Sequence, residues 1–138
     1  MKKITLFAVL ALAFGIFGFN NDANAQTSPV LYFCESYGSY GEIGISDRFT
    51  TGYLTVMVKA DDPLGLSDVS IQFDKYNPST KSFAYYKKFP YNVTPDMNYI
   101  YFSGDDLSFD TPGIYRVFLL DDSGNTVTSG LIEIISKY

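Results

Sequence analysis

Apolar and polar residues alternate with a period of two along most of the chain beyond residue 26. Residues 53–60 show this pattern most clearly. Leu54, Val56 and Val58 fall on one face of an extended strand, and Met57 falls on the other. No window shows the 3.6-residue period of an amphipathic helix. The pattern therefore predicts an all-β fold.

Seven alternating segments can be distinguished, and residues that favour turns separate them. They are residues 30–37, 53–60, 69–76, 82–89, 99–103, 113–120 and 126–135. Many short strands in a chain of this size predict an antiparallel β-sandwich, with a barrel as the alternative. Residues 38–52 are predicted to form a long loop, a kind of segment that is often functional.

The first 25 residues follow a different pattern. Two lysines precede an apolar run over residues 4–19, and Ala23-Asn24-Ala25 follows it. A positive start, an apolar stretch and a small-x-small site are typical of a secretory signal peptide. A retained anchor is the alternative, although a membrane span needs roughly 20 apolar residues. We predict a signal peptide over residues 1–25 and one domain over residues 26–138. That domain would be periplasmic, cell-surface or extracellular, without membrane insertion after cleavage.

The composition excludes several classes of function. The chain carries a net charge of −5 and contains no histidine. An acidic protein lacks the basic footprint that nucleic acid requires. Without histidine, the chain lacks the usual general base near neutral pH and the commonest metal ligand. Histidine-dependent triads and zinc hydrolases are therefore excluded within this chain, and we predict that the protein is not an enzyme.

Cys34 is the only cysteine, so the chain forms no internal disulfide. It lies in an apolar, strand-like run, which favours a buried thiol with a structural role. An intermolecular bridge or a free reactive thiol is the alternative interpretation.

Three segments carry distinctive strand and turn patterns. Leu54–Phe73 is an alternating strand followed by an acidic turn and a second strand, Asp110–Tyr115 reads Asp-Thr-Pro-Gly-Ile-Tyr, and Asp121–Asn125 is an acidic turn with glycine. In order and spacing they resemble segments of the bacterial immunoglobulin-like superfamily, which is of immunoglobulin and fibronectin III type. The resemblance implies an immunoglobulin-like sandwich in which the Tyr115 hydroxyl bonds to upstream backbone.

Paired aspartates in three predicted turns are candidate calcium ligands. They are Asp61 and Asp62, Asp105 and Asp106, and Asp121 and Asp122. Calcium takes oxygen ligands from carboxylates and carbonyls, which loops can supply. The alternative is that these aspartates cap their own turns. No other cofactor is predicted.

Large apolar and aromatic residues form a candidate binding surface. Alternation places Phe118 and Leu120 outward beside Met57, unless a β-bulge rotates one of them inward. A strand core, a protein interface or a sugar-stacking face would each suit six aromatic residues: Tyr85, Tyr86, Phe89, Tyr91, Tyr99 and Tyr101. The predicted surface consists of Met57, Tyr85, Tyr86, Phe118 and Leu120, together with Tyr40 and Phe49 of the long loop.

These features predict an exported, non-enzymatic binding or assembly module. It would act through contacts with a protein partner or through self-association. The alternative is a calcium-dependent or carbohydrate-binding accessory domain.

Overall fold

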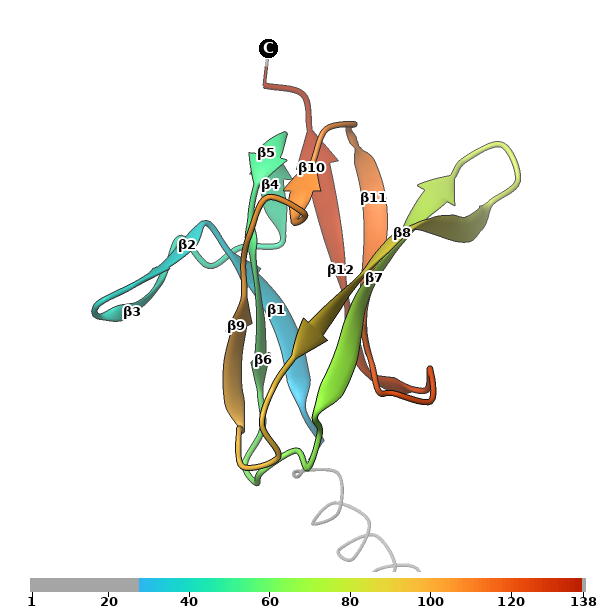
Figure 1. Cartoon of the computed structure of the whole chain (residues 1–138). Helices are drawn as coiled ribbons and strands as arrows, with labels where there is room; N and C mark the ends of the chain where they lie inside the picture. The colour runs from blue at the N-terminus through green and yellow to red at the C-terminus, as the bar shows by residue number, and fades with distance from the viewer. Residues whose placement is uncertain (1–27, 138) are drawn as a thin grey trace, which may run out of the picture.

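The computed structural model describes residues 28–137, and this part of the chain is all-β (Figure 1). The expected all-β class is therefore confirmed, but the described residues form twelve strands rather than seven. The predicted signal peptide lies outside the described residues. In chain order the strands are β1 (Val30–Cys34), β2 (Ser36–Gly38), β3 (Gly41–Ile43), β4 (Arg48–Thr50), β5 (Gly52–Tyr53), β6 (Thr55–Lys59), β7 (Asp68–Asn77), β8 (Ser82–Asn92), β9 (Tyr99–Phe102), β10 (Ser108–Phe109), β11 (Gly113–Leu120) and β12 (Thr126–Ile135).

Two sheets make up the body of the molecule (Figure 1). The five-stranded sheet has the order β4-β12-β11-β7-β8, and the three-stranded sheet has the order β1-β6-β9. Neighbouring strands in both sheets are antiparallel, except that β4 runs parallel to β12. Two short ladders, β5 with β10 and β2 with β3, complete the fold.

The hydrophobic core lies between the two sheets. The three-stranded sheet contributes side chains such as Val56 and Phe102, and the five-stranded sheet contributes Ile71, Val117 and Ile134. All five are almost completely buried. The period-two alternation of the sequence thus gives each sheet one apolar face, and the two faces share one core. This arrangement is consistent with a β-sandwich.

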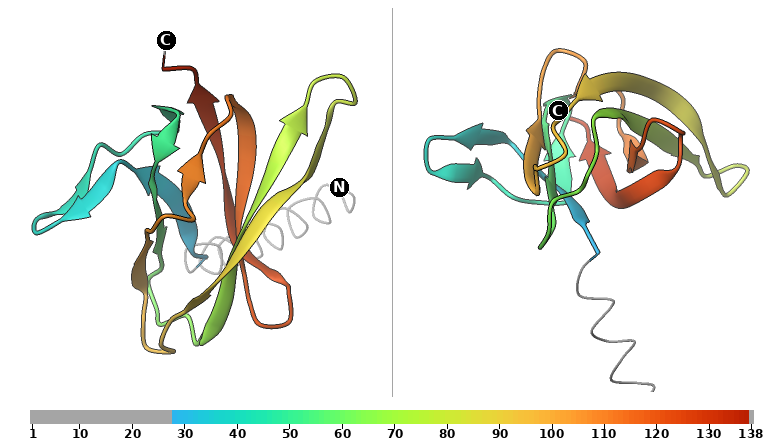
Figure 2. Two further views of the ribbon diagram at one scale, coloured as in Figure 1. Left: turned by 45° about the horizontal axis from the view of Figure 1, so that its top comes forward. Right: turned by 60° about the horizontal axis from the view of Figure 1, so that its bottom comes forward.

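Residues 38–52, predicted to be one long loop, contain β3, β4, the end of β2 and the first residue of β5. Each of these strands is only two or three residues long, so none displays an alternating pattern. Gly41 has φ 104° at the turn of the β2–β3 hairpin, a conformation that glycine adopts without steric cost. The β2–β3 and β7–β8 hairpins extend from opposite sides of the body (Figure 2).

Met57 is fully buried, which corrects the prediction that it contributes to an exposed surface. It lies in β6, the central strand of the three-stranded sheet. Its cross-strand partners are Tyr32 of β1 and Tyr101 of β9. Paired residues share a face of a sheet, so a tyrosine flanks Met57 on each side. Alternation placed Met57 on the correct face of the sheet, but it wrongly predicted that the side chain is exposed.

Leu120 and Phe49 are also buried, so neither belongs to the predicted surface. Leu120 stays opposite Ser70 of β7 and is not part of the core cluster, so it is buried on the outer face of the sheet. The register shift falls in β12, where Thr128 and Thr126 pair with Leu119 and Leu120, so a β-bulge that rotates Leu120 inward does not explain its burial. Phe118 precedes the shift and is half-buried on the outer face. Phe49 joins the core because β4 adds to β12 and pairs it with Ile134.

Tyr115 and Cys34 have the structural roles that the sequence predicts. The buried Tyr115 donates a hydrogen bond of 2.6 Å from its hydroxyl to the Thr111 carbonyl oxygen, four residues upstream. Cys34 is fully buried, and its thiol donates to the Ser36 carbonyl oxygen. Burial raises the pKa of the Cys34 thiol. The buried-thiol interpretation is therefore confirmed.

Candidate functional site

The core has two flanks, and one of them is closed by direct contact between the sheets. This closed flank lies where β1 approaches β12. The Thr128 hydroxyl donates to the Pro29 carbonyl oxygen at 3.1 Å. Gly130 lies so close to β1 that a Cβ atom there would be 2.9 Å from the Leu31 carbonyl oxygen. Glycine at this position lets the two sheets approach without space for a side chain.

The opposite flank is open, because β8 and β9 are both edge strands. β8 pairs only with β7, and β9 pairs only with β6. Among the described residues no strand lies between them, and residues 93–98 connect them directly. We call this side of the molecule, bounded by β8, residues 93–98 and β9, the open flank (Figure 1).

In the half of the open flank next to β10, the side chain of Lys87 of β8 bridges the gap between the two sheets. Its ammonium group donates to the Ser108 carbonyl oxygen at 2.6 Å and to the Asp106 carbonyl oxygen at 3.4 Å. The same group lies over the rings of Phe73 and Phe89, 5.2 and 5.4 Å from their centroids. Lys87 therefore ties the edge of the five-stranded sheet to the segment that includes β10.

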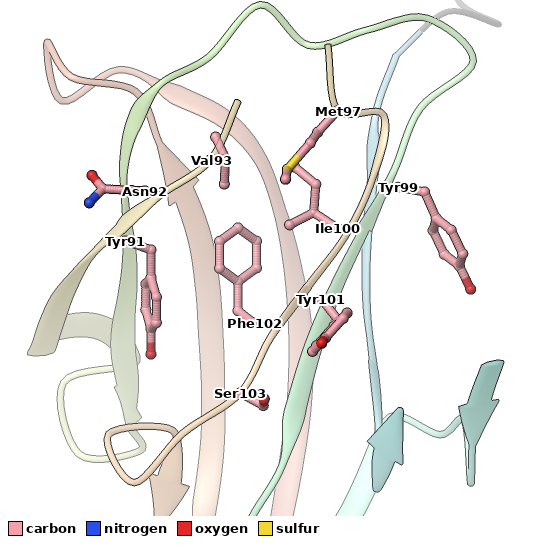
Figure 3. Close-up of a pocket in the computed structure, with 9 residues that line it drawn as sticks. All are labelled: Tyr91, Asn92, Val93, Met97, Tyr99, Ile100, Tyr101, Phe102 and Ser103. Atoms are coloured by element: carbon pink, nitrogen blue, oxygen red, sulfur yellow. The ribbon is translucent and has the colours of Figure 1, made fainter. Parts of the chain in front are cut away.

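The other half of the open flank is a cleft with a volume of about 330 Å³. Figure 3 shows Tyr91, Val93, Met97, Ile100 and Phe102 around the space between β8 and β9. The ring of Tyr91 meets that of Phe102 edge-on at 5.3 Å. Small-molecule sites typically measure roughly 300–1,000 Å³. This cleft is therefore at the small end of that range, and its walls combine apolar side chains with polar groups.

The Tyr91 hydroxyl is a polar atom in the wall of this cleft. It is buried, and no other group within residues 28–137 forms a hydrogen bond with it. Burial, and then the nearby charge of Asp106, raise the pKa of Tyr91. A buried hydroxyl without a partner is unfavourable by about 1–3 kcal/mol. An added group with a donor or acceptor would therefore be stabilised here.

The backbone of β9 has a free edge beside the cleft. The Ala60 N–H donates to the Asn98 carbonyl oxygen at 2.8 Å, so this is a hydrogen-bonded pair of the β6–β9 ladder. Such pairs recur at every second residue of an antiparallel ladder, so Ile100 is also bonded to β6. Tyr99 and Tyr101 must then direct their N–H and C=O groups away from β6, toward the open flank.

On the face of the three-stranded sheet that points away from the core, five residues from β1, β2, β3 and β9 form a cluster. This cluster holds the β2–β3 hairpin in place. We call Tyr32, Tyr37, Glu42, Tyr99 and Tyr101 the tyrosine cluster. The rings of Tyr37 and Tyr101 stack at 4.6 Å with 8° between their planes. Glu42 accepts hydrogen bonds from the hydroxyls of Tyr32 and Tyr99. The hairpin is thereby attached through side chains to β1 and β9.

Hydrogen bonding and burial shift the pKa values within the tyrosine cluster. Bonds from Tyr99 and Tyr32 lower the pKa of Glu42. The bond to Glu42 raises the pKa of Tyr99, and burial followed by the same carboxylate raises that of Tyr32. The cluster is therefore most stable with an ionised carboxylate and neutral phenols. Its tyrosine rings pack on one another, and Tyr99 and Tyr101 remain partly exposed, so sugar binding stays a prediction.

The remaining residues of the predicted surface lie apart from the cleft. Tyr40 is fully exposed at the tip of the β2–β3 hairpin, and Tyr85 and Tyr86 are exposed on β8. Ile114 and Leu131 are exposed on the outer face of the five-stranded sheet, and sequence reasoning did not select them. It selected three of the cleft residues, Tyr91, Tyr99 and Tyr101, as candidate aromatics, but it missed the others. Isolated apolar residues such as Val93 and Met97 in a polar connection were the available signal.

The aspartate pairs occupy three separate turns, after β6, β9 and β11. Asp121 accepts hydrogen bonds from the N–H groups of Ser123 and Asn125, which is the turn-capping role of the alternative interpretation. Within residues 28–137, no three His, Cys, Asp or Glu side chains are grouped so that they could hold a metal ion. Calcium binding stays a prediction.

No protein-family model matches the chain, and no curated protein matches its sequence. The described part of the chain contains no helix that is long and apolar enough to cross a membrane.

Proposed function

We propose that the protein is an exported, non-enzymatic binding or assembly module that contacts a protein partner through its open flank. The observation that carries the proposal is the cleft between β8 and β9, which combines apolar and polar side chains with free backbone groups. Apolar concave surfaces with a few polar groups are common recognition sites.

We further propose that the fold is immunoglobulin-like. In constant-type immunoglobulin domains one sheet has the order A-B-E-D, and the other contains C, F and G. The order β1-β6-β9 corresponds to A-B-E, and β12-β11-β7 corresponds to G-F-C. The hydrogen bond from Tyr115 to the Thr111 carbonyl supports this assignment, because it resembles the tyrosine corner of these domains.

This assignment gives the open flank a simple structural origin. Strand D lies beside strand E in the immunoglobulin arrangement. In this chain β8 leads through residues 93–98 to β9, and no described strand occupies the D position. The free edge of β9 is then the place where a fourth strand of the sheet is missing.

The binding role also agrees with the chemistry of the cleft. The chain has no histidine. The polar side chains around the cleft are phenols, Asn92 and Ser103, which offer hydrogen bonds but no acid–base pair. Export is supported by the signal-peptide pattern of residues 1–25, and it gives the module access to partners in the periplasm, at the cell surface or in the medium.

Site-specific photocrosslinking tests this proposal. Met97 at the cleft and Leu131 on the outer face of the five-stranded sheet are comparably exposed, at 38% and 50%. Each is replaced in turn by benzoylphenylalanine, and the protein is irradiated with envelope and secreted fractions of the source organism. We expect a discrete protein adduct from position 97 and none from position 131. No adduct at 97, or the same adducts at both positions, would contradict the proposal.

A further inference from the structure

The free edge of β9 lacks the features that normally protect an edge strand. Lysine and proline discourage further pairing because they place charge, or no N–H group, along the edge. The other edge of the open flank, β8, contains Lys88 and Pro90. β9 contains neither residue type, and its sequence Tyr-Ile-Tyr-Phe is rich in residues that favour strands. Of the two edges, β9 is therefore the one suited to accept another strand.

The cleft beside this edge matches the side-chain spacing of an extended peptide. Successive side chains of a strand point to opposite faces. A strand bonded to Tyr99 and Tyr101 would direct every second side chain toward the core, next to Ile100 and Phe102. A volume of about 330 Å³ accommodates a few such apolar side chains rather than a second sheet.

Charge at both ends of β9 favours a basic segment. Asp96 precedes the strand, and Asp105 and Asp106 follow it; all three are exposed. The nearest described cations are already engaged, since Lys87 bonds to backbone carbonyls and Lys59 lies over the Tyr99 ring at 5.7 Å. A bound strand with lysine or arginine beyond its ends would therefore meet carboxylates at each end.

The same charges disfavour a second copy of this chain as the occupant. Antiparallel pairing of β9 with β9 of another copy would bring Asp96 of one molecule toward Asp105 and Asp106 of the other. Like charges in direct opposition are destabilising. Symmetric pairing through this edge would thus oppose acidic groups at both ends of the interface.

From these observations we infer that the partner adds an extended segment to β9 as a fourth strand of the three-stranded sheet. Alternate apolar side chains of the segment enter the cleft, and basic residues flank it. This is β-strand addition, in which main-chain hydrogen bonds supply affinity and side-chain pockets supply specificity. The inference rests on the proposed function, because it specifies how the open flank recognises a protein.

Selection from displayed peptides tests the inference with defined probes. One library has lysines at both ends of a segment that alternates apolar and random positions. A second has glutamates at the ends, and a third keeps the lysines but gathers the apolar positions together. The full chain is the bait. We expect enrichment of the first library only; equal enrichment of all three, or of none, would overturn the inference.

Two pairs of variants locate the binding. Tyr101→Pro removes an N–H group from the free edge, and Tyr101→Ala removes the same ring but keeps the N–H. Val93→Trp fills the cleft, and Leu131→Trp adds the same bulk on a different face. For a selected and synthesised peptide, losing one backbone hydrogen bond should weaken binding about tenfold. We expect Tyr101→Pro to bind about tenfold more weakly than Tyr101→Ala, and Val93→Trp to lose binding while Leu131→Trp retains it.

Amide hydrogen exchange provides a readout that does not depend on any variant. Strand addition should protect the amides of Tyr99 and Tyr101 on peptide binding, while that of Ile100 is already protected. Unchanged exchange at Tyr99 and Tyr101 in a saturated complex would exclude strand addition at β9. Protection that rises with protein concentration alone, without peptide, would show pairing between copies and would also overturn the inference.

These results also separate the inference from the proposed function. If position 97 crosslinks to a partner equally well with Tyr101→Pro and Tyr101→Ala, the binding role stands and strand addition is wrong. If position 97 yields no adduct, the proposed function itself is wrong.

Discussion

The two flanks of the core enclose the same kind of apolar interior but in different ways. On the closed flank the backbones of β1 and β12 approach so closely that Gly130 has no room for a Cβ atom. On the open flank β8 and β9 stay apart, and the side chain of Lys87 is the tie across half of the gap. Direct backbone contact leaves no room for another chain on the closed flank. A tie through one side chain leaves the backbone N–H and C=O groups at the edge of β9 available to a partner.

The difference between backbone contact and a side-chain tie indicates that the closed flank is rigid and that the open flank can change locally. At Gly130, the addition of a single methyl group would already force the backbones of β1 and β12 apart. A lysine tie can be lost while the strands on either side keep their own ladders. Variants on the closed flank should therefore affect global stability, and variants on the open flank should affect it less and act locally.

The largest effect is expected for Gly130→Val on the closed flank. Its Cβ would lie 2.9 Å from the Leu31 carbonyl oxygen, so the sheets must separate to admit it. Overpacking of this kind typically destabilises by about 1–3 kcal/mol, and contact with backbone favours the upper end. Urea unfolding measures the change. Ser129→Val, at the exposed neighbouring position, is the control, and equal losses in both variants would contradict the steric argument.

Tyr115→Phe, at a fully buried residue of β11, should have the next largest effect. Removing the hydroxyl eliminates the 2.6 Å bond to the Thr111 carbonyl. We expect a loss of about 1–1.5 kcal/mol in the free energy of unfolding. Tyr53→Phe, at an exposed tyrosine, is the control and should be nearly neutral.

The same variant has a characteristic pH dependence. Burial raises the pKa of Tyr115 from 10.0 to about 12. Because the unfolded chain releases this proton first, the contribution of Tyr115 is complete below pH 10.0 and is lost as pH rises toward about 12. The wild-type protein should therefore lose more stability than Tyr115→Phe over this interval. Parallel curves would show that Tyr115 is not protected from ionisation.

Lys87→Met tests the tie across the open flank directly. It keeps the apolar stem but loses the charged hydrogen bonds to the Ser108 and Asp106 carbonyls. Because the group is only partly buried, we expect a loss of about 1 kcal/mol. Faster amide exchange should be confined to residues 104–109. Lys88→Met, on the exposed neighbouring lysine, is the control, and a uniform rise in exchange over the whole chain would argue against a local tie.

The same contrast explains which parts of the fold the sequence could predict. Alternation identified the long strands and their inward faces, because the burial of one face imposes a period of two. It could not identify β3, β4 and β5, which are too short to show a period. It placed Leu120 on the face of Ser70, where the structure has it, but it could not predict that the side chain is buried there.

The candidate site was harder to predict than the fold. An open flank is a property of strand order, and strand order depends on which edges meet in space. The sequence supplied Val93 and Met97 only as isolated apolar residues in a connection. By contrast, the Tyr115 bond could be predicted, because residues 110–115 resemble the corner segment of immunoglobulin-like domains in which a tyrosine bonds to upstream backbone.

The smallest effect is expected for Glu42→Gln, which tests whether the outer side of β9 is independent of the open flank. Glu42 accepts bonds from Tyr99 and Tyr32, and these bonds lower its pKa from 4.5. A lowered pKa means that this contribution is present above pH 4.5 and is lost as pH falls through the folded-state value. Acid should therefore loosen the β2–β3 hairpin while the core ladders persist.

The amides of the hairpin provide the measurement, since their protection relative to the intrinsic exchange rate should fall in acid more than that of the amides of β7 and β11. In Glu42→Gln they should exchange faster at neutral pH, and Tyr99 should ionise at a lower pH than in the wild-type protein, because the bond to Glu42 is the main cause of its raised pKa. Glu35→Gln, at an exposed carboxylate nearby, is the control.

If peptide binding at β9 is unchanged in Glu42→Gln, the hairpin and the open flank are separate regions. If binding is lost along with the hairpin contacts, the tyrosine cluster helps to hold β9 in place for its partner, and the open flank depends on both faces of that strand.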